Sequence, residues 1–135
     1  MVRDGAVTRM RIATLVSRIL LGLAFTVAGL SGYILTFTSG PPAVPGLAGQ
    51  FQNVIFQSHF VLFTDGFQLV SGLALLFNRY VPLALTISAA VLANILAFHL
   101  TMMPLGIVPG LLLTVCWVLI ALSQRARLEP LLARR

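Results

Sequence analysis

Charge is scarce in this chain of 135 residues, of which 9% are charged and 59% hydrophobic, with a mean hydropathy of +1.00. Soluble domains carry roughly 25% charged residues, so this chain has too few charges to cover a surface in water. Lysine is absent, and all nine basic residues are arginine. Because the arginines flank apolar runs rather than forming a stripe, the net charge of +6 predicts contact with anionic lipid headgroups and not with nucleic acid.

Cysteine is almost absent too. Cys116 is the single one, so an intrachain disulfide and a CxxC redox pair are both excluded. The sequence also contains no Gly-rich phosphate loop, no Ser/His/Asp set and no HExxH motif. Three ligands for a metal ion are not evident, and we predict no metal site. Without a self-contained catalytic motif, the question of enzymatic activity stays open, and a role that is not catalytic on its own is favoured.

Long apolar runs dominate what is present. A bilayer core about 30 Å thick requires about 20 helical residues, and four runs approach or exceed that length. We therefore predict an all-α fold: one membrane domain over residues 1–135, formed by an integral membrane four-helix bundle. The three residues Asn78-Arg79-Tyr80 separate the second run from the third and predict a tight antiparallel hairpin. The predicted spans are residues 14–37, 60–77, 81–101 and 105–123.

The arginines predict the orientation of these spans. Arginine-rich segments stay in the cytoplasm, and the two loops at residues 38–59 and 102–106 contain no arginine. Both termini are therefore expected inside, in a multi-pass protein of the bacterial inner (cytoplasmic) membrane. The arginines of the cytoplasmic side are Arg3, Arg9, Arg11, Arg18, Arg79, Arg125, Arg127, Arg134 and Arg135.

Two segments outside the spans have amphipathic patterns. In the long outer loop, Phe51, Val54 and Ile55 have helical spacing with polar residues between them, which predicts a short interfacial helix over residues 50–58. An ordinary packed loop is the alternative, and the pattern does not decide between them. Residues 124–135 interleave arginine with leucine and are expected on the inner membrane surface.

Small residues recur at every fourth position in three of the spans. Such ridges let helix backbones approach closely in lipid, and we expect them to face the inside of the bundle; a homodimer face is the alternative. On this basis Ala93 is predicted to lie in a close helix contact. The ridges are Ala24-Ala28-Gly32, Ala89-Ala93-Ala97 and Gly106-Gly110-Thr114.

Asp65 is the most unusual residue of the spans, because an ionisable group in hydrocarbon costs about 2.5–3.5 kcal/mol on insertion scales. It lies about 10 Å below the outer boundary at a rise of about 1.5 Å per residue. A carboxylate at that depth must be protonated, paired or facing a wet cavity. Arg18, by contrast, is near the inner end of its span and can extend its long stem to the headgroups.

The hairpin turn at Arg79 predicts the neighbours of Asp65. Counting outward from the turn places Asp65 level with Ala93 and Asn94, while Gln68 is one helical turn below Asp65 on the same face. We predict that Asp65 and Asn94 form one hydrogen-bonded unit, with His99 capping it from the outer interface. Asp65, Gln68, Asn94 and His99 are thus the candidate polar cluster for a proton or a quinone; a purely structural hydrogen-bond cluster is the alternative.

The same counting places His59 level with His99, which raises the question of haem held by two histidines of a helix bundle. Two histidines at one height are common by chance, and no CxxCH motif is present. We therefore do not expect haem.

Three stretches resemble the DoxX-like family of small membrane proteins. The similarity covers roughly residues 17–122, and the Asn-Arg-Tyr-Val-Pro and Phe-His segments are its most specific parts. Many relatives carry a lysine soon after the glycine of the first helix, where this chain has Ser31 and Gly32, so a role for that lysine does not carry over. The stretches are residues 17–25 with Ala28-Gly29-Leu30, residues 78–85 and residues 94–100.

This resemblance implies a four-helix membrane bundle and, in some members, an association with quinone-linked oxidoreductases or thiol-redox proteins. The dithiol version of that chemistry needs two thiols and is not available to a chain with one cysteine. The expected function is therefore an accessory subunit of a redox or quinone-linked membrane complex, with other membrane subunits as partners and quinone as the cofactor left open. Two alternatives remain: a structural or assembly subunit with no site of its own, and a carrier of a small lipophilic molecule.

Overall fold

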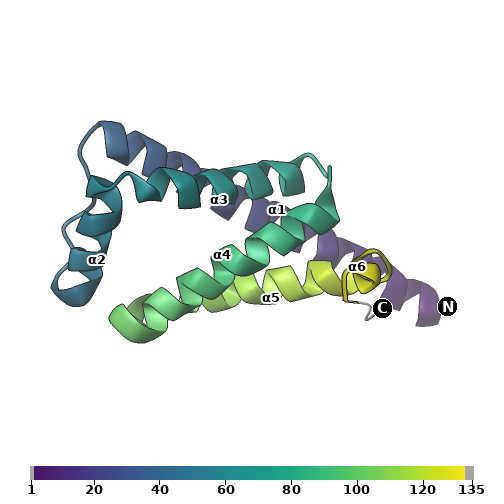
Figure 1. The fold of residues 1–135 in the computed structure, drawn as a ribbon. Coiled ribbons are helices and arrows are strands. Elements are labelled where there is room, and N and C mark those ends of the chain that lie inside the picture. Colours follow the sequence, from purple (N-terminus) through teal and green to yellow (C-terminus); the bar gives the residue numbers. More distant parts are fainter. Residues whose placement is uncertain (1, 133–135) are drawn as a thin grey trace.

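The computed structural model describes residues 2–132, and every regular element in that part of the chain is helical. Three helices are long and apolar enough to cross a membrane, and a fourth span exists if the bent pair α2 and α3 counts as one. The chain is therefore a multi-pass membrane protein with three or four spanning helices (Figure 1). The helices are α1 (Val2–Phe37), α2 (Gly46–Gln57), α3 (Phe60–Leu76), α4 (Val81–Met102), η1 (Pro104–Gly106), α5 (Ile107–Ser123) and α6 (Arg125–Leu132).

The helix boundaries follow the sequence closely, with one exception. The spans predicted at residues 60–77, 81–101 and 105–123 correspond to α3, α4 and η1 with α5. The first helix, however, begins at Val2, before the apolar run that starts at residue 14. At about 1.5 Å per residue, its 36 residues are longer than the hydrocarbon thickness, so its polar N-terminal turns extend beyond the spanning part.

The predicted hairpin between α3 and α4 has a defined stop signal. Asn78 adopts the left-handed conformation with φ of 54°, which asparagine tolerates better than most residues, and the N–H of Arg79 donates to the carbonyl oxygen of Ala74 at 2.9 Å. This is the bonding pattern that commonly ends a helix. Pro82 then occupies the first turn of α4, where a missing N–H costs nothing.

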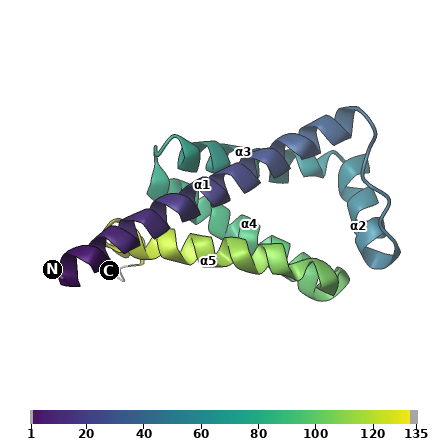
Figure 2. The ribbon, with the colours of Figure 1, turned by 180° about the vertical axis from the view of Figure 1, so that it is seen from behind.

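The segment predicted as a helix or a packed loop is helical. It forms α2, which meets α3 at an angle of 90°. The bend is at His59, whose φ of 58° breaks the helical path. Figures 1 and 2 show α2 standing across the end of the molecule, away from the chain termini. The predicted segment after the last span forms α6, whose described residues end at Leu132; Arg134 and Arg135 lie outside the described residues.

The tightest packing is between α1 and α3, and it depends on glycine. A Cβ at Gly29 would lie 2.8 Å from the backbone oxygen of Asp65, and one at Gly72 would lie 2.7 Å from the backbone nitrogen of Thr26. A Cβ at Gly22 would lie 2.9 Å from Cγ of Leu76. The backbones of the two helices therefore approach to a distance that only glycine permits, as in other membrane helix pairs.

The other helix contacts involve larger side chains. Helix α4 packs on α3 and α5, and α5 also packs on α1. On α4 the buried stripe runs through Val81, Leu85, Ser88 and Leu92. The indole N–H of Trp117 on α5 donates to the carbonyl oxygen of Leu85 at 2.9 Å, which ties α5 to α4.

The prediction that the alanine ridge of α4 is a close helix contact is wrong. Ala93 and Ala97 are exposed, because the stripe that α4 buries is offset from them around the helix. On α1, Gly32 is buried but Ala28 is exposed. The ridge of α5 is where it was expected, since a Cβ at Gly110 would touch Leu96 and Ile95 of α4 at 3.3 and 3.4 Å. Periodicity alone did not identify which small residues are at an interface.

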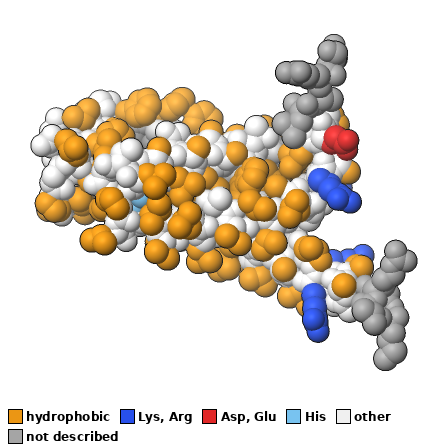
Figure 3. All heavy atoms as spheres, turned by 90° about the horizontal axis from the view of Figure 1, so that it is seen from below, with side chains coloured by type: hydrophobic (Ala, Val, Ile, Leu, Met, Phe, Trp, Pro, Cys, Tyr) orange, Lys and Arg blue, Asp and Glu red, His pale blue; other side chains and the backbone are white. Residues whose placement is uncertain are grey.

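The surface separates apolar from charged side chains. Both chain ends and the turn between α3 and α4 lie toward the same end of the molecule (Figure 1). On the face shown in Figure 3, the arginine and acidic side chains gather at that end, and many hydrophobic side chains are spread over the remainder. Such a distribution suits a protein whose long apolar surface faces lipid.

The glycine contact generates a stability prediction. Exchange of glycine for alanine inside a helix ordinarily favours the helix by about 1 kcal/mol. We expect Gly29→Ala to lower the stability instead, by about 1–3 kcal/mol, because its Cβ would meet the backbone of α3. Thermal unfolding in detergent measures the effect. Ala93→Leu is the control: it adds more atoms at an exposed position and should change little. Equal stability of Gly29→Ala and wild type would refute the close contact.

Candidate functional site: a cavity between three helices

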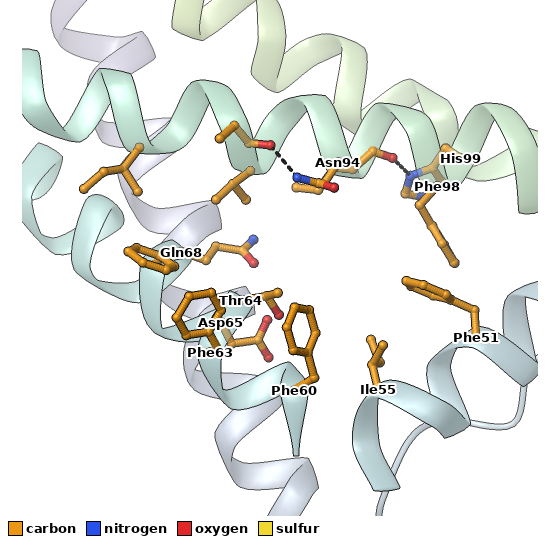
Figure 4. A pocket seen from close by; sticks show the side chains of 15 residues that line it. Phe51, Ile55, Phe60, Phe63, Thr64, Asp65, Gln68, Asn94, Phe98 and His99 are labelled. Atoms are coloured by element: carbon orange, nitrogen blue, oxygen red, sulfur yellow. Dashed lines mark hydrogen bonds between the residues drawn. The ribbon is translucent and has the colours of Figure 1, made fainter. Parts of the chain in front are cut away.

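A cavity of about 620 Å³ lies between α2, α3 and α4. It exists because α3 and α4 diverge from their short turn, and α2 lies across the open end (Figure 4). The volume falls in the range of small-molecule sites, about 300–1,000 Å³. The walls are mainly apolar, and the aromatic side chains among them are Phe51, Phe60, Phe63, Phe67 and Phe98.

The phenylalanines pack against each other in two groups. On α3, Phe63 and Phe67 make an edge-to-face contact with ring centroids 4.8 Å apart, and Phe60 follows at 5.9 Å from Phe63. Across the cavity, Phe51 of α2 meets Phe98 of α4 at 5.7 Å. This second pair lies at the end of the cavity that α2 covers (Figure 4). Phe60 and Phe63 remain 53% and 61% exposed, so the side wall opens toward the surrounding lipid.

The cavity collects the polar residues that the sequence singled out. Asp65 and Gln68 line it from α3, and Asn94 and His99 line it from α4. The close-up in Figure 4 shows the two pairs on facing walls with open space between them. The structure thus brings the four side chains to one site, and their role there stays a prediction.

The predicted hydrogen bond between Asp65 and Asn94 is not formed. The amide of Asn94 donates to the carbonyl oxygen of Ala90 on its own helix at 2.9 Å, and Nδ1 of His99 lies 2.8 Å from the carbonyl oxygen of Ile95. The physical reason is the divergence of α3 and α4, which leaves Asp65 and Asn94 on facing walls with open space between them (Figure 4).

Asp65 is positioned by α1 rather than by α4. Its Oδ2 contacts the backbone of Gly32, which is buried and has no side chain to obstruct it. The hydroxyl of Tyr33, the residue that follows Gly32, donates to the carbonyl oxygen of Leu62 at 2.8 Å. Leu62 lies about one helical turn before Asp65, so this hydrogen bond holds α1 against the first turn of α3. Asp65 itself is half-buried.

His99 has its own glycine neighbour. A Cβ at Gly106 would lie 2.8 Å from Nε2 of His99, so this glycine leaves room for the imidazole at the junction of η1 and α5. His59 is placed differently: it is exposed at the bend between α2 and α3 and does not line the cavity. Within residues 2–132, no group of three or more His, Cys, Asp or Glu side chains could hold a metal ion.

Sequence reasoning missed the aromatic wall and the contribution of α2. Phe60, Phe63 and Phe67 follow at i, i+3 and i+7, which places them on one helix face and could have indicated a shared surface. The helical spacing of Phe51 and Ile55 predicted a helix but not its place at the cavity, because that place depends on the bend at His59.

Comparison with models of known protein families, with curated proteins and with solved structures gave no match. The resemblance to DoxX-like proteins therefore stays a prediction.

The contact between Asp65 and Gly32 can be tested by a double-mutant cycle. Gly32→Ala should destabilise the protein, since the new Cβ would collide with the Asp65 carboxylate. In an Asp65→Ala background the collision is removed, and we expect a coupling of about 0.5–3 kcal/mol between the two positions. Gly29→Ala is the control, because it meets the backbone of Asp65 and should show no such rescue. Additive effects at Gly32 and Asp65 would contradict the contact.

Proposed function

We propose that this protein is a small integral membrane subunit of DoxX-like type, accessory to a redox or quinone-linked complex of the bacterial cytoplasmic membrane. The observation that carries the proposal is the aromatic-lined cavity of about 620 Å³ with its few polar side chains. A site of this size, open to lipid and furnished with convergent polar groups, suits a small lipophilic ring compound.

The chemistry of the walls supports a quinone as the occupant. Its ring would pack between the phenylalanines of α3 and the Phe51–Phe98 pair. A quinone carbonyl accepts hydrogen bonds, and Gln68 has two amide N–H groups for this purpose. Asn94 keeps a second N–H beside the one that it donates to Ala90. These two amides, on facing walls, would orient the ring, and redox chemistry would occur in a partner subunit.

The alternative of a carrier for a small lipophilic molecule rests on the same cavity, specifically on its opening between exposed phenylalanines.

The alternative of a structural or assembly subunit rests on the outer faces of α1 and α5. Both helices expose large apolar side chains along their length, including Val27 at 61% and Leu112 at 60%. Other membrane subunits could pack there as readily as lipid.

The proposed arrangement in the membrane is a four-helix bundle of α1, α3, α4 and α5 with both termini in the cytoplasm. Two observations support it: the termini and the α3–α4 turn lie toward one end, and the charged side chains visible in Figure 3 gather at that end. Helix α2 would then lie near the outer interface, and residues 125–132 near the inner one.

Quinone binding can be measured directly. Decylubiquinone should bind the purified protein saturably in dodecyl maltoside, above its partition into empty micelles. Gln68→Leu should weaken this binding roughly fivefold to tenfold by removing the free N–H donors. Gln50→Leu makes the same exchange at an exposed position outside the cavity and should leave binding unchanged. If wild-type protein shows no saturable binding, quinone is not the ligand.

The topology is tested by cysteine labelling in a Cys116→Ala background. A cysteine introduced at Gln50 should react with an impermeant maleimide from outside the cell, and one at Arg79 only after the membrane is opened. Labelling of Gln50→Cys exclusively from the cytoplasmic side would reverse the proposed orientation.

A further inference from the structure

Within the part of the chain that the structure describes, the cavity contains a carboxylate and no arginine to balance its charge. Asp65 is its only acidic side chain, and no arginine lines it among the described residues. Elsewhere an intramembrane carboxylate is usually paired with a cation or with hydrogen-bond donors. Here its Oδ2 lies against the backbone of Gly32, which supplies no positive charge. The site therefore presents a carboxylate without a protein partner.

The neutral polar groups of the cavity add acceptor oxygens beside the carboxylate, although Gln68 and Asn94 also keep amide donors. The hydroxyl of Thr64 donates to the carbonyl oxygen of Val61 at 3.0 Å, and one N–H of Asn94 donates to Ala90. A carbonyl oxygen can only accept, so Nδ1 of His99 is the donor in its 2.8 Å contact with the carbonyl oxygen of Ile95. These hydrogens are directed into the helices themselves. The Thr64 and Asn94 oxygens keep their capacity to accept, and Gln68 retains free donors.

The aromatic walls also favour a positively charged ligand. The faces of phenylalanine rings carry negative partial charge and attract cations, most strongly where water is excluded. Five phenylalanines line this cavity on all three of its helices. The carboxylate, the acceptor oxygens and the ring faces together make a site that is complementary to positive charge.

We infer that the cavity between α2, α3 and α4 binds a lipophilic ammonium ion, a protonated amine attached to an aromatic or aliphatic body, with Asp65 as its counter-ion. The amine N–H groups would donate to Asp65 and to the oxygens of Thr64 and Asn94, and the apolar body would occupy the space between the phenylalanines. Entry is lateral, from the lipid, past Phe60 and Phe63. This inference rests on the cavity being a ligand site, as proposed above, but not on that ligand being a quinone.

Three naphthalenes of matched size test the inference. They are 1-(2-aminoethyl)naphthalene, which is an ammonium ion at pH 7 because alkyl amines titrate near 10, its hydroxyl analogue 1-(2-hydroxyethyl)naphthalene, and the uncharged isostere 1-propylnaphthalene. Binding to the protein in dodecyl maltoside is measured by equilibrium dialysis against empty micelles. The amine should bind about tenfold or more tightly than the propyl compound, with the alcohol between them.

Two variants test whether the preference for the amine depends on the charge of Asp65. Asp65→Asn keeps the side-chain shape and removes the carboxylate, so it should abolish the preference for the amine over the alcohol. Glu129→Gln removes the same charge from an exposed position on α6 and should preserve that preference. Circular dichroism of each variant reports its folding. If Asp65→Asn is unfolded, the ranking of the three compounds on wild-type protein still decides.

The outcomes separate this inference from the proposed function. Equal binding of amine and propyl compound, or an unchanged preference in folded Asp65→Asn, overturns the ammonium site while leaving quinone binding intact. Absence of binding by all three compounds, with saturable binding of decylubiquinone, also overturns it. Preference for the amine without decylubiquinone binding supports the inference and removes the quinone proposal.

Discussion

The close approach of α1 and α3 is the contact on which the remainder of the structure depends. Gly22, Gly29 and Gly72 remove the side chains that would hold the two backbones apart. In lipid, where burial of apolar surface brings no gain, close backbone packing is what favours association. Once α3 is fixed on α1, Asp65 is held against Gly32, and the direction in which α4 leaves the hairpin is set by the turn at Asn78.

The cavity is a consequence of two local backbone events. The left-handed residues of the α3–α4 turn start the two helices close together, and the helices then diverge. At the other end, the bend at His59 turns α2 by 90° relative to α3, so that Phe51 reaches Phe98. Without that bend, α2 would continue the path of α3 and the gap between α3 and α4 would lack its outer wall.

The shape and the polarity of the cavity restrict different properties of a ligand. Volume and aromatic lining favour a lipophilic ring, and they are equally compatible with a quinone or an aryl amine. Polarity distinguishes these ligands, since a quinone needs donors whereas an ammonium ion needs negative charge and acceptors. The divergence of α3 and α4 separates Asp65 from Asn94, which leaves both groups available to a third molecule instead of to each other. The same geometry that removed the predicted hydrogen bond therefore leaves a cavity between the two side chains.

Much of this architecture was decided by the sequence alone. Apolar run length and turn residues determined the number and positions of the apolar helices, because both are local properties of the chain. Hairpin counting named Asp65 and Asn94 as neighbours, and both line the cavity from facing helices. Only the tertiary structure decided which small residues are at a helix interface, as the exposed Ala93 and the buried Gly29 show. It also decided how widely α3 and α4 diverge from their turn. Both depend on the angle between helices, which packing of distant residues sets.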